Sequence, residues 1–473
     1  MSSPGVDELL DGDTTALGES YRCGAVTPEA VVEHTLARIA ERNPAINALA
    51  YLDADGARAA AKASARRWAA GTPLSGLDGV PVTVKDSVHT TGMPWRHGCA
   101  ANRDLPDSTF DAPPAARLKE AGAVILGKTT MPDFGMMAAG VSSLYGITRN
   151  PWQLSRNTGG SSAGAGASLA AGIGFGSVGS DIAGSVRLPA GHCGLVALKP
   201  TQGRIPHLAP STMRSAGPMA RTVDDVILLY DVLSRPDQRD VWSLAPESGE
   251  TNREPLYPFG FRIGVLTELV PGYVAADPVT EVVSAAAAAL SDGGATVATM
   301  PPVFTDTDPY PALDRVFQVR AVAELQSIAA DRRDQVHPVI RQWCAPAADF
   351  SAADLTRDTE AVARSAEVIR AACAEFDFVL APVLPMVGFD AEECGADPSQ
   401  PLGHCGFTAW FNQTGAPASA VCFGFSGGMP VGVQVIGPRF ADRAVLRLTK
   451  WLESARGFSI TWPKPVAAVG GTR

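Results

Sequence analysis

The sequence has little that could form a disulfide framework or a metal site. Its 473 residues include eight cysteines, but no two of them form a C-x-x-C pair. The seven histidines are dispersed, and none belongs to an H-E-x-x-H motif or to a close His/Cys cluster. We therefore expect reduced cytoplasmic thiols and no metal. The cysteines are Cys23, Cys99, Cys193, Cys344, Cys373, Cys394, Cys405 and Cys422.

The sequence also lacks runs of positive charge and long apolar segments. Only 19% of its residues are charged and the net charge is −10, which disfavours binding to nucleic acid or to an anionic membrane. The first residues show neither the basic nor the apolar part of a signal peptide. An uncharged stretch lies between Arg156 and Asp181, but it is too rich in glycine and serine for a membrane span. These absences predict a cytoplasmic protein with no nucleic-acid or membrane partner.

The chain instead alternates between apolar, strand-like segments and amphipathic, helix-like segments, and 46% of its residues are hydrophobic. Such alternation predicts an α/β layered fold with a large core. No internal repeat or long linker interrupts it, so we expect one large domain preceded by a helical segment over residues 1–70. The expected strands are 79–88, 261–268, 376–385 and 431–437, and the expected helices are 27–43, 57–70, 167–173, 221–234 and 441–455.

Two glycine motifs match the sequence patterns of nucleotide-binding loops. Residues 122–129 match the P-loop string G-x-x-x-x-G-K-[ST], but the four residues between the glycines are Ala-Val-Ile-Leu, which suit a buried strand. Residues 174–179 match G-x-G-x-x-G, but the segment that follows is broken by glycine and proline. A dinucleotide site requires a helix at that point. Neither motif therefore predicts a bound nucleotide.

A third motif, G-x-S-x-G at residues 160–164, would make Ser162 the nucleophile of an α/β-hydrolase. That nucleophile needs a strand immediately before it, whereas residues 151–159 are loop-like. A triad would also need a histidine, and none stands in a distinctive context. We keep this as the weaker alternative, with His192, His207, His337 and His404 as the available histidines.

The same stretch suggests a different chemistry when it is combined with Lys85. Ser161 and Ser185 both lie in glycine-rich backbone, where main-chain N–H groups can approach a reacting atom closely. Lys85 ends an apolar strand, and burial would lower its pKa from about 10.4 by several units. Because a neutral lysine can act as the base for a serine, these three residues form a candidate nucleophilic site without histidine.

Four blocks along the chain resemble the amidase signature hydrolases. The strongest is residues 148–206, which contains both serines. Residues 77–86 match the family's lysine strand, and residues 121–134 and 411–437 match two further blocks. The resemblance covers nearly the whole chain. It implies a single large α/β/α layered domain with a mixed central sheet flanked by helices, and a catalytic domain over residues 71–473.

The resemblance also implies a role for each candidate residue. Lys85 is the base, Ser161 the bridging serine in a cis peptide, and Ser185 the nucleophile. No cofactor or metal is implied. The implied oxyanion hole consists of the backbone at Ile182, Ala183, Gly184 and Ser185.

Some positions depart from the family pattern. The common GGSSGGS is GGSSAGA here, and the common GTDTGGS is GSDIAGS. Ala183 still supplies an N–H group, and none of the three catalytic positions is lost. Among the neighbours, we interpret Asp181 and Arg187 as a pair that fixes the nucleophile loop, Ser162 as a residue that bonds locally, and Asp86 as a solvated or structural carboxylate.

The resemblance says less about the substrate than about the reaction. By family position, Phe134, Gly135, Met136 and Met137 should lie near the acyl pocket, which would suit an apolar acyl group. Aromatic residues of the C-terminal half could contribute, or could belong to the core. These are Phe407, Trp410 and Phe411.

We therefore expect an amidase that hydrolyses a small linear amide, with a homodimer as a possible assembly. The alternative is the glutaminase component of a tRNA-dependent amidotransferase. Such a component should carry charged groups for the amino-acid end of glutamine, whereas residues 402–415 offer apolar and neutral side chains. A third interpretation, an inactive homologue that only binds ligands, is disfavoured because Lys85, Ser161 and Ser185 are all present.

Overall fold

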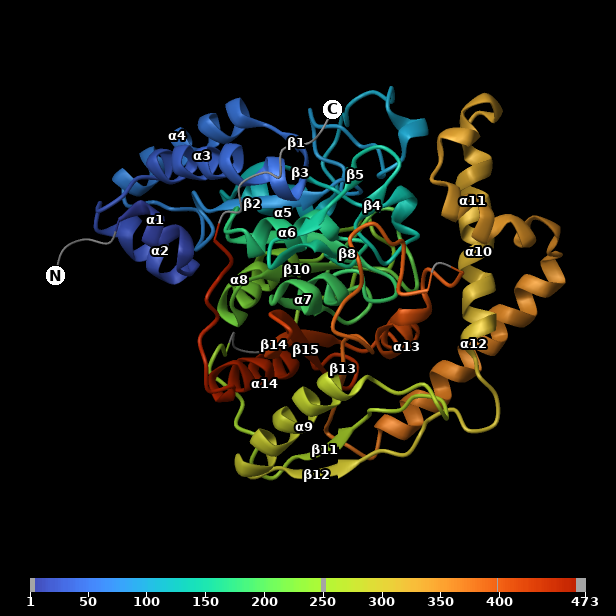
Figure 1. The fold of residues 1–473 in the computed structure, drawn as a ribbon. Helices are drawn as coiled ribbons and strands as arrows, with labels where there is room; N and C mark the ends of the chain where they lie inside the picture. Colours follow the sequence, from blue (N-terminus) through green and yellow to red (C-terminus); the bar gives the residue numbers. More distant parts are fainter. Residues whose placement is uncertain (1–4, 248–251, 398, 465–473) are drawn as a thin grey trace.

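The computed structural model describes residues 5–247, 252–397 and 399–464, and its centre is an eleven-stranded sheet (Figure 1). The strands lie in the order β1-β3-β2-β8-β10-β9-β14-β15-β13-β11-β12. They are β1 (Leu49–Leu52), β2 (Pro81–Lys85), β3 (Val124–Thr129), β8 (Gly176–Asp181), β9 (Val196–Lys199), β10 (Ser215–Ala220), β11 (Arg262–Val265), β12 (Thr296–Thr299), β13 (Phe378–Pro382), β14 (Ala418–Ser426) and β15 (Met429–Ile436).

The sheet is mixed. Strand β2 runs parallel to β3 and β8, and β11 runs parallel to β12 and β13. The remaining neighbours are antiparallel. A mixed sheet flanked by helices confirms the predicted fold class.

Helices cover the sheet and extend beyond it. They are α1 (Val6–Asp11), α2 (Thr14–Arg22), α3 (Pro28–Ile46), α4 (Ala54–Ala69), α5 (Pro113–Glu120), α6 (Ala163–Ala170), α7 (Arg187–Cys193), α8 (Val223–Leu233), α9 (Asp277–Asp292), α10 (Tyr310–Ser327), α11 (Pro338–Cys344), α12 (Ala352–Cys373), α13 (Gly406–Gln413) and α14 (Asp442–Ala455). Successive side chains of a strand point to opposite faces. On β8, a Cβ at Gly176 would meet Leu229 of α8, and a Cβ at Gly179 would meet Ser162 at the start of α6. The sheet therefore lies between two helical layers.

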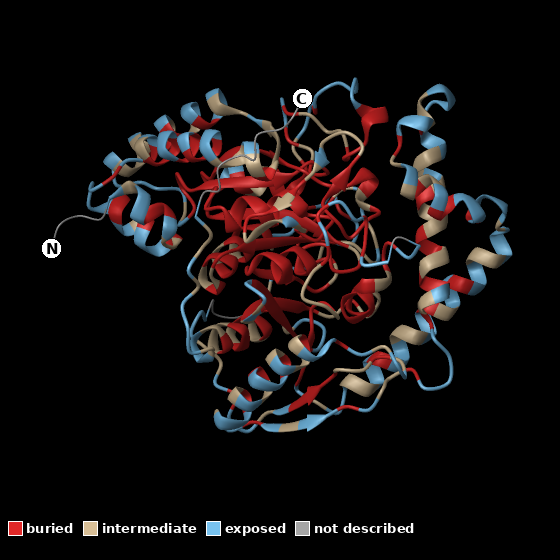
Figure 2. Ribbon diagram, viewed as in Figure 1, coloured by how far each residue is buried: buried red, intermediate tan, exposed pale blue. Residues whose placement is uncertain are grey.

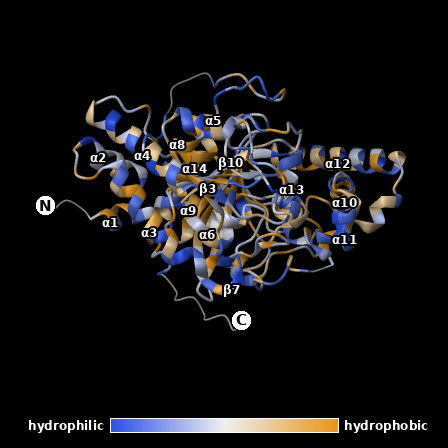
Figure 3. Ribbon diagram, turned by 90° about the horizontal axis from the view of Figure 1, so that it is seen from above, coloured by the Kyte–Doolittle hydropathy of each residue, from blue (hydrophilic) through white to orange (hydrophobic). Residues whose placement is uncertain are grey.

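Burial is concentrated in the sheet and the helices beside it, as Figure 2 shows. Every residue of β2, β3, β8, β13 and β15 is buried. The view from above in Figure 3 places α10, α11 and α12 together at one side of the molecule. No helix in the described ranges is both long and apolar enough to cross a membrane.

Two buried hydroxyls join the strands that carry the candidate site. Thr83 of β2 donates a hydrogen bond of 2.9 Å to Oγ of Ser177 in β8, and both side chains are fully buried. These residues are direct partners in the parallel ladder. Because β2 and β8 are parallel, Lys85 and Asp181, their last residues, end at the same edge of the sheet.

Several element boundaries differ from the predictions. Helix α3 begins after its Thr27 cap as expected, but it continues past Pro44 to Ile46, where Asn47 ends it in a left-handed conformation. Helix α6 starts at Ala163, four residues before the predicted position, because the glycines and alanines after Ser162 are helical. The segment predicted as a loop, 151–159, contains β7 (Gln153–Asn157), which pairs with β6 (Arg149–Asn150) outside the main sheet.

The two nucleotide-like motifs lie in strands. Residues 124–129 are buried strand β3, and most of the 174–179 motif belongs to β8. Neither glycine motif forms a loop before a helix, so the decision against both nucleotide interpretations is confirmed.

Several elements of the structure lie outside the strands and helices that the sequence patterns predicted. Strand β1, from the predicted N-terminal segment, pairs with β3 in the main sheet, and the boundary at residue 70 stays a prediction. Helices α10 to α12 were not predicted individually. The remaining short strands are β4 (Val141–Ser142) and β5 (Gly146–Ile147).

Candidate active site

Lys85 is buried at the end of β2 and hydrogen-bonds to two serines. Its Nζ lies 2.7 Å from Oγ of Ser161 and 3.1 Å from Oγ of Ser180. Burial removes water from the ammonium group and lowers the pKa of Lys85 to about 7, against the smaller opposing effect of Asp181. The charge of Arg214 lowers this pKa further. A substantial fraction of Lys85 is therefore a neutral amine near pH 7.

The segment that carries Ser161 passes very close to other backbone. The Gly160–Ser161 peptide bond is cis, as the resemblance implies. A Cβ at Gly160 would lie only 2.5 Å from the backbone nitrogen of Ala139, so only glycine fits there. The N–H of Ser162 then donates to the carbonyl of Ser185 at 3.1 Å. This bond brings the segment that follows Ser161 into contact with the residue predicted as the nucleophile.

Ser185 lies in the turn between β8 and α7, and the carboxylate of Asp181 organises this turn. It accepts hydrogen bonds from the N–H groups of Gly184 at 2.8 Å and Val186 at 3.2 Å. Arg187 also donates to it, from Nε at 3.1 Å and Nη2 at 3.0 Å. The predicted role of Asp181 and Arg187 as a pair that fixes the loop is confirmed.

The Asp181–Arg187 pair is completely buried. Burial alone would raise the pKa of Asp181, but the charge and hydrogen bonds of Arg187, together with Asn412, lower it to about 2. Arg187 also donates to Oδ1 of Asn412 at 2.7 Å and to Oε1 of Gln434 at 3.1 Å. The pair is therefore ionised and well satisfied, as a buried pair must be.

The hydrogen bond to Asp181 changes the expected set of oxyanion donors. The N–H of Gly184 is occupied by that carboxylate. The N–H groups of Ile182, Ala183 and Ser185 make no hydrogen bond within the part of the chain that the structure describes. Gly184 has φ +120°, and a Cβ there would lie 2.3 Å from Oγ1 of Thr408. Gly184 therefore forms the turn, its N–H is bonded to Asp181 in this structure, and the composition of the oxyanion hole stays a prediction.

Helix α13 supports the same turn from the other side, through two residues that the sequence patterns did not reveal. Thr408 donates to the carbonyl of Ala183 at 2.6 Å. Asn412 donates to both the carbonyl and Oδ1 of Asp181, each at 2.9 Å. A signal existed in the sequence, because a Thr and an Asn four residues apart share one face of a largely apolar helix.

The other side chains of α13 belong to the core. Phe407, Trp410 and Phe411 are almost completely buried. Phe407 packs against Tyr273, with ring centroids 5.3 Å apart, and Trp410 packs against Phe304 at 5.1 Å. Of the two interpretations left open for these aromatics, core packing is the one that the structure supports.

Of the four residues expected near the acyl pocket, 134–137, only some border the candidate site. A Cβ at Gly135 would lie 3.2 Å from Oγ of Ser161, so this backbone borders the site. Phe134, with φ +55°, packs edge-to-face with His97, with ring centroids 6.0 Å apart. Met136 and Met137 are buried in the main core cluster.

The hydrolase alternative finds no support in the geometry. Oγ of Ser162 is fully buried and donates weakly to the carbonyl of Ser180 at 3.4 Å. None of the four candidate histidines bonds to it. His404 bonds to the carbonyl of Ala138 at 3.2 Å, His337 contacts Sγ of Cys394, and both ring nitrogens of His192 and His207 lack partners among the described residues.

Asp86, which follows the lysine, has a structural role as predicted. Its carboxylate accepts from the N–H groups of Arg96 at 3.1 Å and Gly98 at 2.8 Å, and from the hydroxyl of Tyr145 at 3.1 Å. These bonds hold the segment 96–98 beside the end of β2. Asp86 makes no contact with Ser161 that could compete with Lys85.

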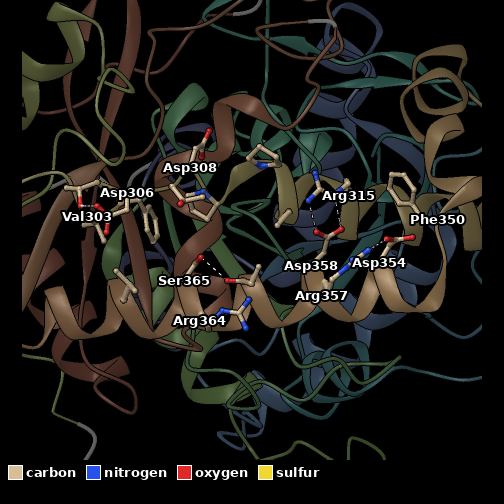
Figure 4. A pocket seen from close by; sticks show the side chains of 18 residues that line it. Val303, Asp306, Asp308, Arg315, Phe350, Asp354, Arg357, Asp358, Arg364 and Ser365 are labelled. Atoms are coloured by element: carbon tan, nitrogen blue, oxygen red, sulfur yellow. Dashed lines mark hydrogen bonds and ion pairs between the residues drawn. The ribbon is translucent and has the colours of Figure 1, made fainter.

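Two cavities differ in their relation to this site. One of about 590 Å³ is lined by Ser87, Trp95, His97 and the segment 208–214, close to the end of β2. A larger one, of about 1030 Å³, lies between α10 and α12 (Figure 4). Two of its arginines pair with carboxylates of α12, Arg315 with Asp358 and Arg357 with Asp354, and it includes no candidate catalytic residue.

Comparison with known proteins identifies the family of the chain. A family model described as Amidase matches residues 30–446. The chain belongs to the amidase family. The A component of the glutamyl-tRNA(Gln) amidotransferase of Symbiobacterium thermophilum is 35% identical over 91% of this chain and 94% of its own. Indoleacetamide hydrolase of Bradyrhizobium diazoefficiens is 33% identical over 94% of this chain and 86% of its own.

Solved structures of other amidase-family enzymes have the same fold. A bacterial aryl acylamidase of the amidase signature family superposes with a TM-score of 0.86 at 27% identity, over 94% of this chain and 96% of its own. The 6-aminohexanoate cyclic dimer hydrolase superposes with a TM-score of 0.87 at 28% identity, over 96% of this chain and 99% of its own. The activities that give these relatives their names differ, so membership of the amidase family leaves the substrate open.

Proposed function

We propose that the protein is an amidase that hydrolyses a linear carboxylic acid amide through an acyl-enzyme on Ser185. The observation that supports this most directly is the buried Lys85 amine, 2.7 Å from Oγ of Ser161 and with its pKa lowered to about 7. A base is most effective when its pKa lies near the working pH. The bond between the N–H of Ser162 and the carbonyl of Ser185 supports a relay between the two serine segments.

The proposed acylation begins when Oγ of Ser185 attacks the amide carbonyl. The proton of Ser185 passes to Ser161, and the proton of Ser161 passes to Nζ of Lys85. The N–H groups of Ile182, Ala183 and Ser185 are the available donors for the oxyanion. When the C–N bond breaks, Lys85 returns a proton through Ser161 to the leaving amine.

Deacylation uses the same groups in the reverse direction. Lys85, again neutral, accepts a proton from water through Ser161, and the water oxygen attacks the acyl carbonyl. Cleavage of the ester bond returns the proton to Ser185 and releases the carboxylic acid. The cycle consumes one water, forms one amine and one acid, and requires no further reactant.

The glutaminase component of an amidotransferase is the second candidate, favoured by the identity with the A components of glutamyl-tRNA(Gln) amidotransferases. Against it, residues 402–415 contain no acidic or lysine or arginine side chain that could hold the amino-acid end of glutamine. The histidine of this segment, His404, is buried and bonded to the carbonyl of Ala138. On the composition of this segment alone, the stand-alone amidase is the function that we favour, in the cytoplasm and with a homodimer as its possible assembly.

A serine-directed phosphonate and an amide panel test the proposal. We expect one phosphonyl adduct, on Ser185 by peptide mapping, and release of amine from simple aryl or alkyl amides by the chain alone. An adduct on Ser162 would restore the hydrolase interpretation. Release of ammonia from glutamine, with no turnover of the other amides, would instead identify a glutaminase.

A further inference from the structure

The cavity of about 590 Å³ beside Lys85 contains two arginines with no carboxylate partner. Arg214 belongs to the segment before β10, Arg320 belongs to α10, and both line the cavity. No carboxylate oxygen of the described residues lies within 4.0 Å of either guanidinium group. The Nε atoms of both are buried without a hydrogen-bond partner. Both arginines are half-buried, and Arg214 donates one hydrogen bond, from Nη2 to the carbonyl of Ala209 at 2.5 Å. Most of their N–H groups therefore have no partner among the described residues and are available to an anion.

The charges that line this cavity do not cancel. Glu324, one turn after Arg320 on α10, is the only carboxylate among the lining residues. Burial, followed by the charge of Arg320, lowers the pKa of Arg214 to about 10. Burial also raises the pKa of Glu324, although both arginines oppose this effect. The cavity therefore keeps an excess of positive charge in a chain whose net charge is −10.

The cavity adjoins the candidate catalytic groups. Ser87 lines it two residues after Lys85, and the charge of Arg214 acts on Lys85 itself. Met213, next to Arg214, accepts a hydrogen bond of 3.2 Å from Asn412. The same amide group of Asn412 donates to Asp181 in the nucleophile turn. Lys85, Ser161 and Ser185 do not themselves line the cavity, which adjoins them through Ser87 and the segment that carries Met213 and Arg214.

One wall of the cavity is flat and aromatic. His89 stacks on Trp95 with ring centroids 4.8 Å apart, and Trp95 stacks on His97 at 5.1 Å. Burial lowers the pKa of His97 to about 3, so its ring is neutral at pH 7. A planar or alkyl part of a substrate can pack on this wall while an anionic end reaches the arginines.

We infer that Arg214 and Arg320 bind the carboxylate of the substrate, so that the preferred substrates are amides that carry a second, anionic carboxyl group. This inference rests on the proposed function. The substrate carboxylate accepts hydrogen bonds from the two guanidinium groups, and the negative charge of Glu324 offsets part of their positive charge. The arginines determine specificity and take no part in bond cleavage.

Matched amides test the inference. Glutaryl-4-nitroanilide and pentanoyl-4-nitroanilide differ by the carboxylate at the acyl end, and 4-acetamidobenzoate and 4-methylacetanilide differ by it at the amine end. Calorimetry with Ser185→Ala measures their binding without turnover. We expect the anionic member of at least one pair to bind about tenfold or more tightly than its neutral partner.

Variants in the Ser185→Ala background assign that preference to the arginines. Arg320→Gln and Arg214→Gln should each reduce it to less than about threefold. Arg320→Lys should keep part of it, and Glu324→Gln should increase it. The matched control is Arg315→Gln, which removes an arginine of α10 that pairs with Asp358 in the other cavity and should leave the preference unchanged.

Several outcomes would overturn the inference. One is equal binding of the anionic and the neutral amide in both pairs. Another is a preference for the anionic amide that persists in both Arg214→Gln and Arg320→Gln. Tight binding of free glutarate without any preference between the amides would indicate an anion site separate from the substrate. Turnover of the same four amides by the unmodified enzyme separates the two proposals: hydrolysis without an anionic preference would leave the amidase proposal intact while rejecting this one.

Discussion

Lys85 combines complete burial with two serine partners, and Lys128 provides a natural comparison. Lys128 is also fully buried, on neighbouring strand β3, and its pKa is lowered to about 8 by burial. Its Nζ donates to the carbonyl of Val88 instead of a serine. Burial and a lowered pKa are thus shared by both lysines, and the contact with Ser161 distinguishes the candidate base.

Replacement of Lys85 by Met should abolish catalysis while the fold persists. We expect kcat/KM for a simple amide to fall by about 100- to 10,000-fold, because a general base contributes a factor of this size. Circular dichroism and a thermal melt check that the variant is folded. Lys128→Met is the control and should remain within about tenfold of the parent. Comparable losses in both variants would argue against a specific role for Lys85.

The rate of acylation should depend on pH through Lys85. Since the proposed base is the neutral amine with a pKa of about 7, kcat/KM should rise about tenfold between pH 6 and pH 8 and then level off. The pKa values of His97 and Asp181, about 3 and about 2, lie well below this range. A profile that is flat from pH 6 to 8 would contradict a base that titrates near 7.

At the scale of elements, α13 and α7 hold the nucleophile turn between them. Thr408→Val removes the hydroxyl that bonds to Ala183 while keeping the side-chain volume. We expect kcat to fall by about tenfold, since a small displacement of the oxyanion donors is costly. Thr35→Val is the control, because Thr35 is a buried threonine that bonds within its own helix, α3. It should change kcat by less than about twofold.

The ion pair that links β8 to α7 should dominate the local stability. Arg187→Ala leaves Asp181 as a buried charge without its partner, so the free energy of unfolding should fall by about 3–5 kcal/mol. Arg315→Ala removes an arginine from a partly exposed pair and should cost about 1 kcal/mol or less. Urea denaturation at pH 7 measures both changes, and equal losses would show that burial of the Asp181–Arg187 pair adds nothing.

For the whole molecule, opposing sets of buried groups determine how stability depends on pH. Burial lowers the pKa of Lys85 and Lys199 to about 7 and that of Lys128 to about 8. Between pH 7 and 8 the unfolded lysines still bind protons that the folded ones have lost. The free energy of unfolding therefore rises with pH in this window. The rise is about 1 kcal/mol once the opposite effect of the buried cysteine thiols is included.

Above about pH 8.5 the direction should reverse. Burial raises the pKa of seven cysteines, so their thiols keep protons that the unfolded chain releases near its ordinary pKa of about 8.5. Urea denaturation in reducing buffer should show maximum stability near pH 8. A steady increase up to pH 10 would mean that water reaches the thiols.

The sequence alone predicts the fold class, which the structure confirms, and it nominates the candidate catalytic residues. Both depend on patterns within short segments. It identified Lys85 at the end of an apolar strand, and it rejected the P-loop because Val124 to Leu126 suit a strand. It did not reveal that the N–H of Gly184 bonds to Asp181, because that bond depends on how the turn folds. Arg320 went unnoticed because only the packing of α10 brings it near Arg214.

The hydroxyl pair of Thr83 and Ser177 has a consequence for how this enzyme could diversify. A slip of one residue between β2 and β8 would turn the side chain of Lys85 to the opposite face of the sheet. The buried hydrogen bond between Thr83 and Ser177 disfavours such a slip of β2 along β8, because a shifted hydroxyl would be buried without a partner. Substitutions in α10 and in residues 208–214 can therefore change which substrates bind. The distance between Nζ of Lys85 and Oγ of Ser161 stays the same, because buried strands hold it.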